Sequence, residues 1–220
     1  MSDGSNPRRD DGADEHTPTD GGPSRSGRRP AVFVDRDGTL CRHVPYLDEP
    51  SEVEPLPTVA TGVRRLNETG VPVVIVTNQS GVGRGYFSER TLHRVNARLL
   101  ADLAGQGARV TDCYYCPHHP DAGCDCRKPA AGLIETAAAD YGLDPRASYV
   151  IGDRASDVTA GRRADCTTVW FPSAETDDDA DPNPDHTVET FREAVRIVRR
   201  DLSEPVTPAD EERSADVTGR

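Results

Sequence analysis

The chain of 220 residues has few hydrophobic residues and no long hydrophobic run. Its hydrophobic content of 35% is too low for the whole chain to be packed in a core, so we expect one domain with disordered ends. No apolar run approaches the roughly 20 residues that cross a bilayer. Residues 1–30 lack the apolar middle of a secretory signal, and we therefore expect a cytoplasmic protein without membrane contacts.

Positive charge is scarce, and lysine is nearly absent. The formal net charge is −12, which argues against nucleic acid or an anionic membrane as a partner, because both select basic surfaces. Lys128 is the only lysine, whereas arginine is abundant and Asp outnumbers Glu. This composition fits either a high-salt cytoplasm, where net charge maintains solubility, or a GC-rich genome. Under both interpretations the retained lysine is expected where a compact ammonium is needed.

Strands alternate with helices along the chain, which predicts an α/β fold with a Rossmann-like parallel sheet and helices on both faces. Buried strands are expected at 32–34, 71–77, 112–115, 148–151 and 167–171, and helices at 58–69, 88–104, 131–141, 156–163 and 186–202. The predicted organisation is a disordered tail (1–29), one folded domain (30–173), an acidic linker (174–186), a candidate terminal helix (187–202) and a second disordered tail (203–220).

Two segments that follow strands are expected to be loops. Residues 43–57 contain too much proline for a helix, and a loop that leaves the tip of the first strand can fold back over a ligand. Glycines at 81, 83 and 85 predict a flexible loop that carries Arg84, although this pattern alone is a weak phosphate-loop signal. The first loop offers four side chains as substrate contacts, with simple packing as the alternative: His43, Val44, Pro45 and Tyr46.

Polar side chains occur where the predicted strands end. Asp35 and Asp37 follow the first strand and lie two residues apart, so both can face one ligand while Arg36 points away. The pair 77–78 (Thr-Asn) and Asp153 follow two other strands. Ligands of open α/β sheets bind at the carboxyl ends of the strands, so we expect these groups to converge with the single lysine. A surface turn is the alternative interpretation of Asp-Arg-Asp-Gly.

The cysteines indicate a metal site rather than disulfides. Four of the six fall within residues 113–126, and nothing indicates secretion. Three thiolates and one imidazole suit a closed tetrahedral structural Zn²⁺, with reduced, unligated cysteines as the alternative. The candidate ligands are Cys116, Cys124, Cys126 and either His118 or His119. The other three cysteines are expected to be small core residues: Cys41, Cys113 and Cys166.

Several motifs resemble those of a known family. The segments 35–39 (Asp-Arg-Asp-Gly-Thr), 77–81 (Thr-Asn-Gln-Ser-Gly), 126–129 (Cys-Arg-Lys-Pro) and 152–157 (Gly-Asp-Arg-x-x-Asp) are similar to the four motifs of the haloacid dehalogenase (HAD) superfamily of phosphohydrolases. Cys-Pro-His-His-Pro at 116–120, followed by Cys-Asp-Cys-Arg-Lys-Pro, resembles its zinc-containing subfamily of D,D-heptose 1,7-bisphosphate phosphatases and histidinol phosphatases. The resemblance covers about residues 31–171 and implies a HAD-type domain with a minimal cap and a zinc-stabilised loop. It also selects His118 as the fourth zinc ligand.

The residue chemistry fits the mechanism that this resemblance implies. Asp35 would attack phosphorus and form an aspartyl-phosphate, and Asp37 would act first as general acid and then as general base. Thr77 and Lys128 would hold the nonbridging oxygens. Mg²⁺ would be held by Asp35, Asp153 and, by resemblance, the backbone carbonyl of Asp37, because hard cations prefer oxygen ligands.

The remaining candidates are substrate contacts. Arg127 has a planar guanidinium suited to a second anionic group, as the family implies, and the family has a basic residue at Arg154. Asp157 is equally suited to starting a helix, to supporting the site and to binding the metal. Three polar residues that follow the second strand complete the candidate substrate contacts: Asn78, Gln79 and Ser80.

The predicted function is hydrolysis of a small phosphorylated metabolite by a monomer that uses Mg²⁺ and carries Zn²⁺. Similarity in the segments 81–87 and 114–120 favours heptose bisphosphate over histidinol phosphate as the substrate. A zinc-stabilised binding module without catalysis is an alternative of another class. A dehalogenase of the same fold is disfavoured by Asp37, because displacement of a halide needs no acid at the leaving group.

Overall fold

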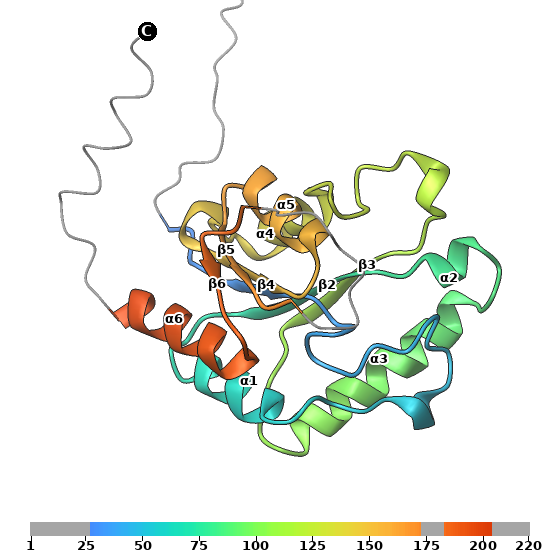
Figure 1. Cartoon of the computed structure of the whole chain (residues 1–220), viewed down its shortest axis with the longest axis horizontal. Coiled ribbons are helices and arrows are strands. Elements are labelled where there is room, and N and C mark those ends of the chain that lie inside the picture. Colours follow the sequence, from blue (N-terminus) through green and yellow to red (C-terminus); the bar gives the residue numbers. More distant parts are fainter. Residues whose placement is uncertain (1–26, 173–182, 204–220) are drawn as a thin grey trace, which may run out of the picture.

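The computed structural model describes residues 27–172 and 183–203 (Figure 1). Most of the predicted tails, at 1–26 and 204–220, and most of the predicted linker, at 173–182, lie outside the described residues. Within the first predicted tail, Arg29 is joined to the domain, because its carbonyl accepts a hydrogen bond from the Asp144 amide at 2.9 Å. In the described part of the chain, no helix is long and apolar enough to cross a membrane.

The strands form one six-stranded sheet in the order β3-β2-β1-β4-β5-β6, and every neighbouring pair is parallel. The central strand β1 has Val32 level with Val73 of β2 on one side and with Tyr149 of β4 on the other. This sheet confirms the predicted α/β fold class. The strands are β1 (Val32–Val34), β2 (Val73–Asn78), β3 (Asp112–Cys116), β4 (Tyr149–Gly152), β5 (Thr167–Trp170) and β6 (His186–Thr187).

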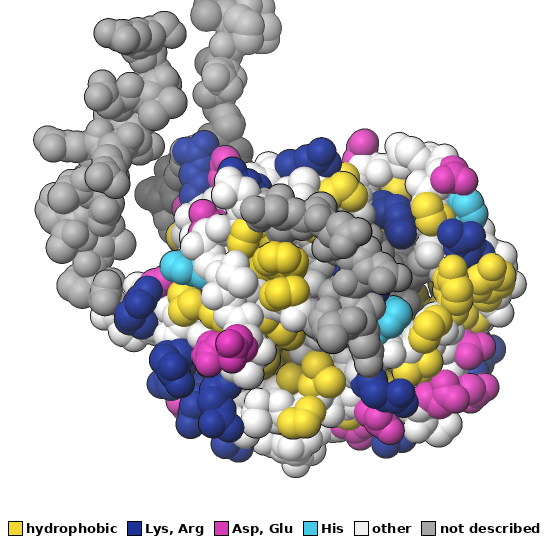
Figure 2. Space-filling model, in the orientation of Figure 1, with side chains coloured by type: hydrophobic (Ala, Val, Ile, Leu, Met, Phe, Trp, Pro, Cys, Tyr) yellow, Lys and Arg dark blue, Asp and Glu magenta, His cyan; other side chains and the backbone are white. Residues whose placement is uncertain are grey.

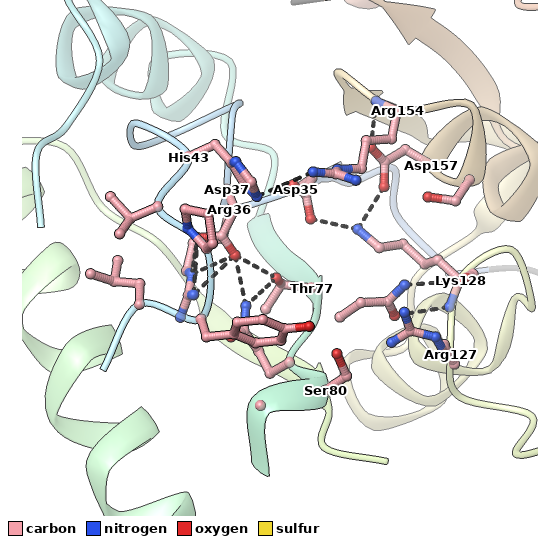
Figure 3. Close-up of a pocket in the computed structure, with 18 residues that line it drawn as sticks. Asp35, Arg36, Asp37, His43, Thr77, Ser80, Arg127, Lys128, Arg154 and Asp157 are labelled. Carbon is pink, nitrogen blue, oxygen red and sulfur yellow. Dashed lines mark hydrogen bonds and ion pairs between the residues drawn. The ribbon is translucent and has the colours of Figure 1, made fainter. Parts of the chain in front are cut away.

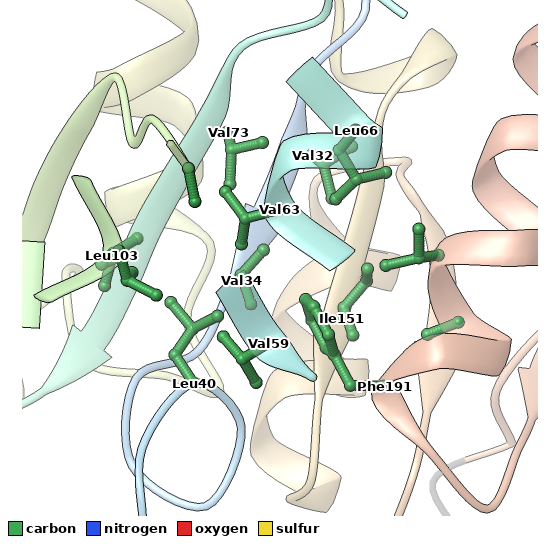
Figure 4. Packing of buried hydrophobic residues seen from close by; sticks show 14 of the residues in the cluster. Val32, Val34, Leu40, Val59, Val63, Leu66, Val73, Leu103, Ile151 and Phe191 are labelled. Atoms are coloured by element: carbon green, nitrogen blue, oxygen red, sulfur yellow. The ribbon is translucent and has the colours of Figure 1, made fainter. Parts of the chain in front are cut away.

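Helices cover both faces of the sheet (Figure 1). Alternate residues of β1 pack on opposite sides, so Val32 and Val34 lie in one hydrophobic cluster and Phe33 lies in the other. The first cluster receives α1, α3 and α6 and is drawn in Figure 4, and the second receives α4 and α5. The helices are α1 (Val59–Asn67), α2 (Ser80–Gly83), α3 (Glu89–Ala104), α4 (Gly132–Tyr141), α5 (Ala155–Arg163) and α6 (Phe191–Ser203), with short 3₁₀ helices at Pro50–Glu52, Pro120–Ala122 and Pro145–Ala147.

Two local expectations are corrected by the structure. Residues 81–85 were predicted to be a flexible loop, but Ser80–Gly83 form the short helix α2. A side chain at Gly83 would collide with the backbone of His119, so this glycine allows α2 to pack closely against residues 117–119 rather than providing flexibility. The last helix begins at Phe191 instead of 186, because residues 186–187 add strand β6 to the edge of the sheet.

The three cysteines expected in the core differ in burial. Cys41 and Cys166 are buried, whereas Cys113 is only partly buried on β3. Cys113 packs against the first hydrophobic cluster. The partial exposure of Cys113 follows from the place of β3 at an edge of the sheet, where a strand is less enclosed than the central strand β1.

Candidate active site

A cavity of about 440 Å³ lies at the carboxyl ends of β1 and β2 (Figure 3). The structure therefore brings together motifs that are far apart in the sequence, as expected for ligand sites in open α/β sheets. Asp153 is fully buried, with its carboxylate close to that of Asp35, and does not line the cavity. All the other predicted catalytic and substrate-binding residues line the cavity: Asp35, Asp37, His43, Val44, Pro45, Tyr46, Thr77, Asn78, Gln79, Ser80, Arg127, Lys128 and Arg154.

The side chain of Lys128 points into the centre of the site, between two carboxylates (Figure 3). Its ammonium lies 2.6 Å from Asp35 Oδ1 and 2.6 Å from Asp157 Oδ1, and it also donates to the Val76 carbonyl at 2.6 Å. Burial alone would lower the pKa of Lys128, but the charges of Asp157 and Asp35 outweigh it, so the pKa is raised. The only lysine of the chain is therefore a buried cation beside the predicted nucleophile.

Three buried carboxylates crowd together at the cavity wall, of which Asp35 and Asp157 line the cavity. Asp35, Asp153 and Asp157 can each present one oxygen such that the three atoms lie within 4.8 Å of one another. Burial, opposed by Lys128 and reinforced by the neighbouring carboxylates, raises the pKa of Asp35 to about 8. Burial and then Asp157 raise the pKa of Asp153 to about 6. The cluster therefore carries more negative charge than its surroundings neutralise.

The environment of Asp153 fits a hard cation. Its Oδ1 accepts a hydrogen bond from Thr39 at 3.0 Å, whereas its Oδ2 is buried and has no hydrogen-bond partner among the described residues. Gly38, with a φ of 85°, turns the chain directly over this carboxylate, and a side chain at Gly38 would collide with Asp153 Oδ2. An oxygen left without a donor, among several carboxylates, is the kind of donor set that Mg²⁺ prefers.

Asp157 has a structural role as well as a place in this cluster. Its Oδ2 accepts a hydrogen bond from the Arg154 backbone amide at 3.1 Å, which caps the start of α5. Its other oxygen faces Lys128. The sequence left the role of Asp157 open among helix start, support and metal ligand, and the structure gives it contacts of the first two kinds.

Asp37 is held apart from the other three carboxylates by its own donors. Gln79 Nε2 donates to Asp37 Oδ2 at 2.7 Å, and the guanidinium of Arg36 approaches the same carboxylate at 2.9 Å. Arg36 is 1% exposed, and it also donates to Asn96 of α3 at 2.7 Å. The prediction that Arg36 points away from the site was wrong, because Arg36 lines the cavity and pairs with Asp37. A buried guanidinium next to an aspartate needs that partner. The sequence signal for this ion pair was an arginine between two aspartates at the end of a buried strand.

Two predicted substrate contacts use their amides within the protein. Asn78 donates to the Lys128 carbonyl at 2.9 Å and accepts from the Lys128 amide at 3.0 Å. Gln79 binds Asp37 and also donates to Thr77 Oγ1 at 2.9 Å. These side chains line the cavity, yet their hydrogen bonds place the predicted catalytic groups.

A further polar contact joins two of the predicted substrate-binding residues. Arg154 Nη2 and His43 Nε2 lie 3.2 Å apart, and Figure 3 marks this contact with a dashed line. Arg127 lies on another wall, and its Nη1 is buried without a hydrogen-bond partner in the described part of the chain. The cavity therefore has cationic groups on several walls although the whole chain is acidic.

The predicted zinc ligands converge on one point. The ligand atoms of the four residues lie within 4.8 Å of one another, with Cys116–Cys124 at 3.5 Å, Cys124–Cys126 at 3.4 Å and His118–Cys126 at 3.1 Å. The sulfur atoms of a tetrahedral zinc site are separated by roughly 3.8 Å, given a Zn–S distance of about 2.3 Å. The donor set thus fits zinc. His119 instead accepts a hydrogen bond from the Asp121 amide at 3.2 Å, so the geometry agrees with His118.

The Cys/His loop, residues 116–126, is hydrogen-bonded to residues next to the cavity. The backbone N–H of Gln79 donates to the Cys116 carbonyl at 2.8 Å, and the backbone N–H of Gly83 donates to the Pro117 carbonyl at 2.7 Å. Arg127 and Lys128 follow directly after the loop. A rigid loop would therefore position both of these cations.

Comparison with known proteins identifies relatives along most of the folded part. A profile of the family described as HAD-hydrolase-like matches residues 125–194. The chain is 45% identical over 123 residues to a probable D-glycero-D-manno-heptose-1,7-bisphosphate 7-phosphatase of Thermoplasma acidophilum, which covers 56% of this chain and 77% of the relative. It is 39% identical over 157 residues to the D-glycero-beta-D-manno-heptose-1,7-bisphosphate 7-phosphatase of Rhodopseudomonas palustris, over 68% of this chain and 87% of the relative.

A solved structure agrees with these sequence matches. The D,D-heptose 1,7-bisphosphate phosphatase from B. bronchiseptica, complexed with magnesium and phosphate, superposes with a TM-score of 0.70 at 28% identity. The alignment covers 78% of this chain and 98% of that protein. This chain therefore belongs to the HAD-like phosphatase family that contains the D-glycero-D-manno-heptose-1,7-bisphosphate 7-phosphatases.

Proposed function

We propose that this protein is a Mg²⁺-dependent phosphatase that removes the 7-phosphate of D-glycero-D-manno-heptose 1,7-bisphosphate. The observation that carries the proposal is the single lysine, buried 2.6 Å from Asp35 at the base of a cavity with further cationic walls. An ammonium in this place compensates a carboxylate nucleophile and attracts a phosphate dianion despite the net charge of −12. The relatives named above support the choice of substrate.

Asp35 attacks the phosphorus atom, forms an aspartyl-phosphate and displaces the sugar alkoxide, which splits a difficult hydrolysis into two steps. Asp37 gives its proton to the leaving oxygen and then takes a proton from the water that cleaves the aspartyl-phosphate. Lys128 and Thr77 bind nonbridging oxygens of the phosphoryl group, each contributing about 3 kcal/mol by comparison with other preorganised donors. Arg36 and Gln79 keep the carboxylate of Asp37 in place.

The donor set described above supports a Mg²⁺ ion held by Asp35, Asp153 and the backbone carbonyl of Asp37. When bound, the ion would neutralise charge between the carboxylates and the phosphate dianion. We also propose that the Cys/His loop binds a structural Zn²⁺ through its three thiolates and His118. That ion would hold the loop in the conformation that presents Arg127 and Lys128.

Arg127 supports a substrate with a second anionic group. Its buried Nη1 lacks a partner among the described residues, and an unpaired buried donor is unfavourable by about 1–3 kcal/mol. A second phosphate of the substrate would satisfy this donor.

The test is phosphate release by the purified full chain from heptose 1,7-bisphosphate, histidinol phosphate and simple alkyl phosphates, with Mg²⁺ and with a chelator. We expect Mg²⁺-dependent release that is fastest with the heptose bisphosphate and is abolished by Asp35→Asn. Asp102→Asn, at a partly exposed position of α3 that does not line the cavity, is the matched control and should retain full activity. Release that survives Asp35→Asn would overturn the mechanism, and absence of release from every ester would favour a binding module.

A further inference from the structure

Two large hydrophobic side chains are exposed in the described part of the chain, and they touch each other at the mouth of the cavity. Tyr46 is 46% exposed and Tyr86 is 58% exposed. Their rings meet edge to face, with centroids 4.7 Å apart, and the guanidinium of Arg84 lies 6.0 Å from the centre of the Tyr46 ring. We call these three residues the outer rim. Figure 2 shows hydrophobic side chains at the surface near α2, on the right of the view.

The backbone holds the ring of Tyr46 at this place. Tyr46 has a φ of 55°, a left-handed conformation that few non-glycine residues adopt. The turn around it is closed by a 3.2 Å hydrogen bond from the Leu47 amide to the Val44 carbonyl, and the side chain of Leu47 is buried. Backbone of this kind clusters at ligand sites because only surrounding structure maintains it.

Backbone hydrogen bonds also hold the segment that carries Arg84 and Tyr86. Arg84 and Tyr86 follow α2, which the Gly83–Pro117 backbone bond ties to the Cys/His loop. The Tyr86 amide donates to the Gly81 carbonyl at 2.9 Å. Arg84 has no ion pair within residues 27–172 and 183–203, so its charge is available at the mouth of the cavity.

We propose that the outer rim is a subsite for the part of the substrate remote from the phosphoryl group that Asp35 attacks. This inference rests on the proposed function and deepens it. The C–H surface of an extended sugar packs against the two tyrosine rings, and Arg84 binds a hydroxyl of the sugar, while Arg127 takes the second phosphate. The outer rim therefore selects extended sugar phosphates over short phosphate esters. Tyr46 lines the cavity, whereas Arg84 and Tyr86 do not. Variants of Arg84 and Tyr86 therefore test the subsite without changing the groups that carry out the chemistry.

The test compares kcat/KM for heptose 1,7-bisphosphate with kcat/KM for glycerol 3-phosphate, which has a similar primary ester but lacks the rest of the sugar. For Arg84→Gln and for Tyr86→Ala we expect the ratio of the two values to fall about three- to ten-fold, mainly through a higher KM for the sugar. Arg94→Gln, at an exposed position of α3, and Tyr141→Ala, at a partly buried position of α4, are the matched controls; neither residue lines the cavity, so both variants should keep the ratio of the unmodified protein.

The outcomes separate this inference from the proposed function. An unchanged ratio in both outer-rim variants of an active enzyme would overturn the subsite and leave the phosphatase standing. An equal loss on both esters would also overturn it, since it would indicate a general structural effect. If the unmodified protein releases phosphate from no ester, the proposed function falls and the subsite falls with it.

Discussion

Asp37 depends on its neighbours for its position at the base of the cavity. Gln79 and Arg36 donate to its carboxylate from two directions, and both donors are buried. The carboxylate itself remains 17% exposed toward the cavity. A proton donor must lie within hydrogen-bond reach of the leaving oxygen, so loosening either support should affect proton transfer more than substrate binding.

Gln79→Leu removes one of these supports. We expect kcat to fall about tenfold for an alkyl phosphate, because the leaving alkoxide needs a proton, and to fall less for p-nitrophenyl phosphate, whose leaving group needs none. Steady-state kinetics on both esters measures the difference. Gln106→Leu, in the exposed turn that follows α3, serves as the control. Equal losses on the two esters would show that Gln79 acts on something other than proton transfer.

At the scale of elements, the Cys/His loop connects several parts of the cavity wall. It follows β3, it is hydrogen-bonded to the residues around α2, and it ends where Arg127 and Lys128 begin. Its own hydrophobic contribution is small, because Cys124 and Cys126 are only partly buried. A bound metal would therefore supply much of its rigidity.

Cys124→Ala should remove the proposed zinc ion. We expect the zinc content, measured by elemental mass spectrometry, to fall from about one ion per chain to nearly none, since three ligands do not close a tetrahedral site. The KM for phosphate esters should rise more than kcat falls, because the loop positions the cations that bind phosphate. Cys113→Ala, which changes a partly buried cysteine outside the loop, is the control. An unchanged zinc content in Cys124→Ala would refute the assignment.

For the whole molecule, the central electrostatic problem is an acidic protein that binds a phosphate dianion. Figure 2 shows arginine side chains gathered over α6 and α1, at the lower left of the view. The cations of the cavity belong to other segments, Arg127, Lys128 and Arg154 among them. Binding must therefore rely on these short-range groups, because screening at physiological salt reduces charge effects beyond about 8 Å.

The buried carboxylates couple the stability of the whole fold to pH and to Mg²⁺. Asp35 and Asp153 have pKa values raised to about 8 and about 6, so the folded chain holds protons that the unfolded chain releases above about pH 4. Without metal, stability should therefore fall as pH rises through this window. Mg²⁺ competes with those protons, and we expect it to raise Tm by more at pH 8.5 than at pH 6.

Differential scanning fluorimetry across this pH range, with Mg²⁺ and with chelator, measures the coupling. Asp153→Asn should abolish most of the Mg²⁺-dependent rise in Tm, because it removes a carboxylate whose Oδ2 has no other partner in the described structure. Asp102→Asn should leave that rise intact. A rise that is the same at pH 6 and at pH 8.5 would contradict the proposed linkage.

Much of the fold could be predicted because its signals are local. The β-branched run at 71–77 and the helical spacing at 88–104 predict β2 and α3 without reference to the rest of the chain. Strand β6 was missed because two residues carry no periodicity, and only the neighbouring β5 makes them a strand. In the same way, α2 was missed because it is held by the Cys/His loop, which is distant in sequence.

The sequence by itself determined which chemical groups follow each strand, and hence the family and the list of reactive side chains. Only the tertiary structure decided how those groups are shared: Asn78 positions Lys128, Gln79 and Arg36 hold Asp37, and Asp157 joins the carboxylate cluster. The physical reason is that a hydrogen bond depends on distances between segments, and an amide suited to a substrate is equally suited to a neighbouring backbone or carboxylate.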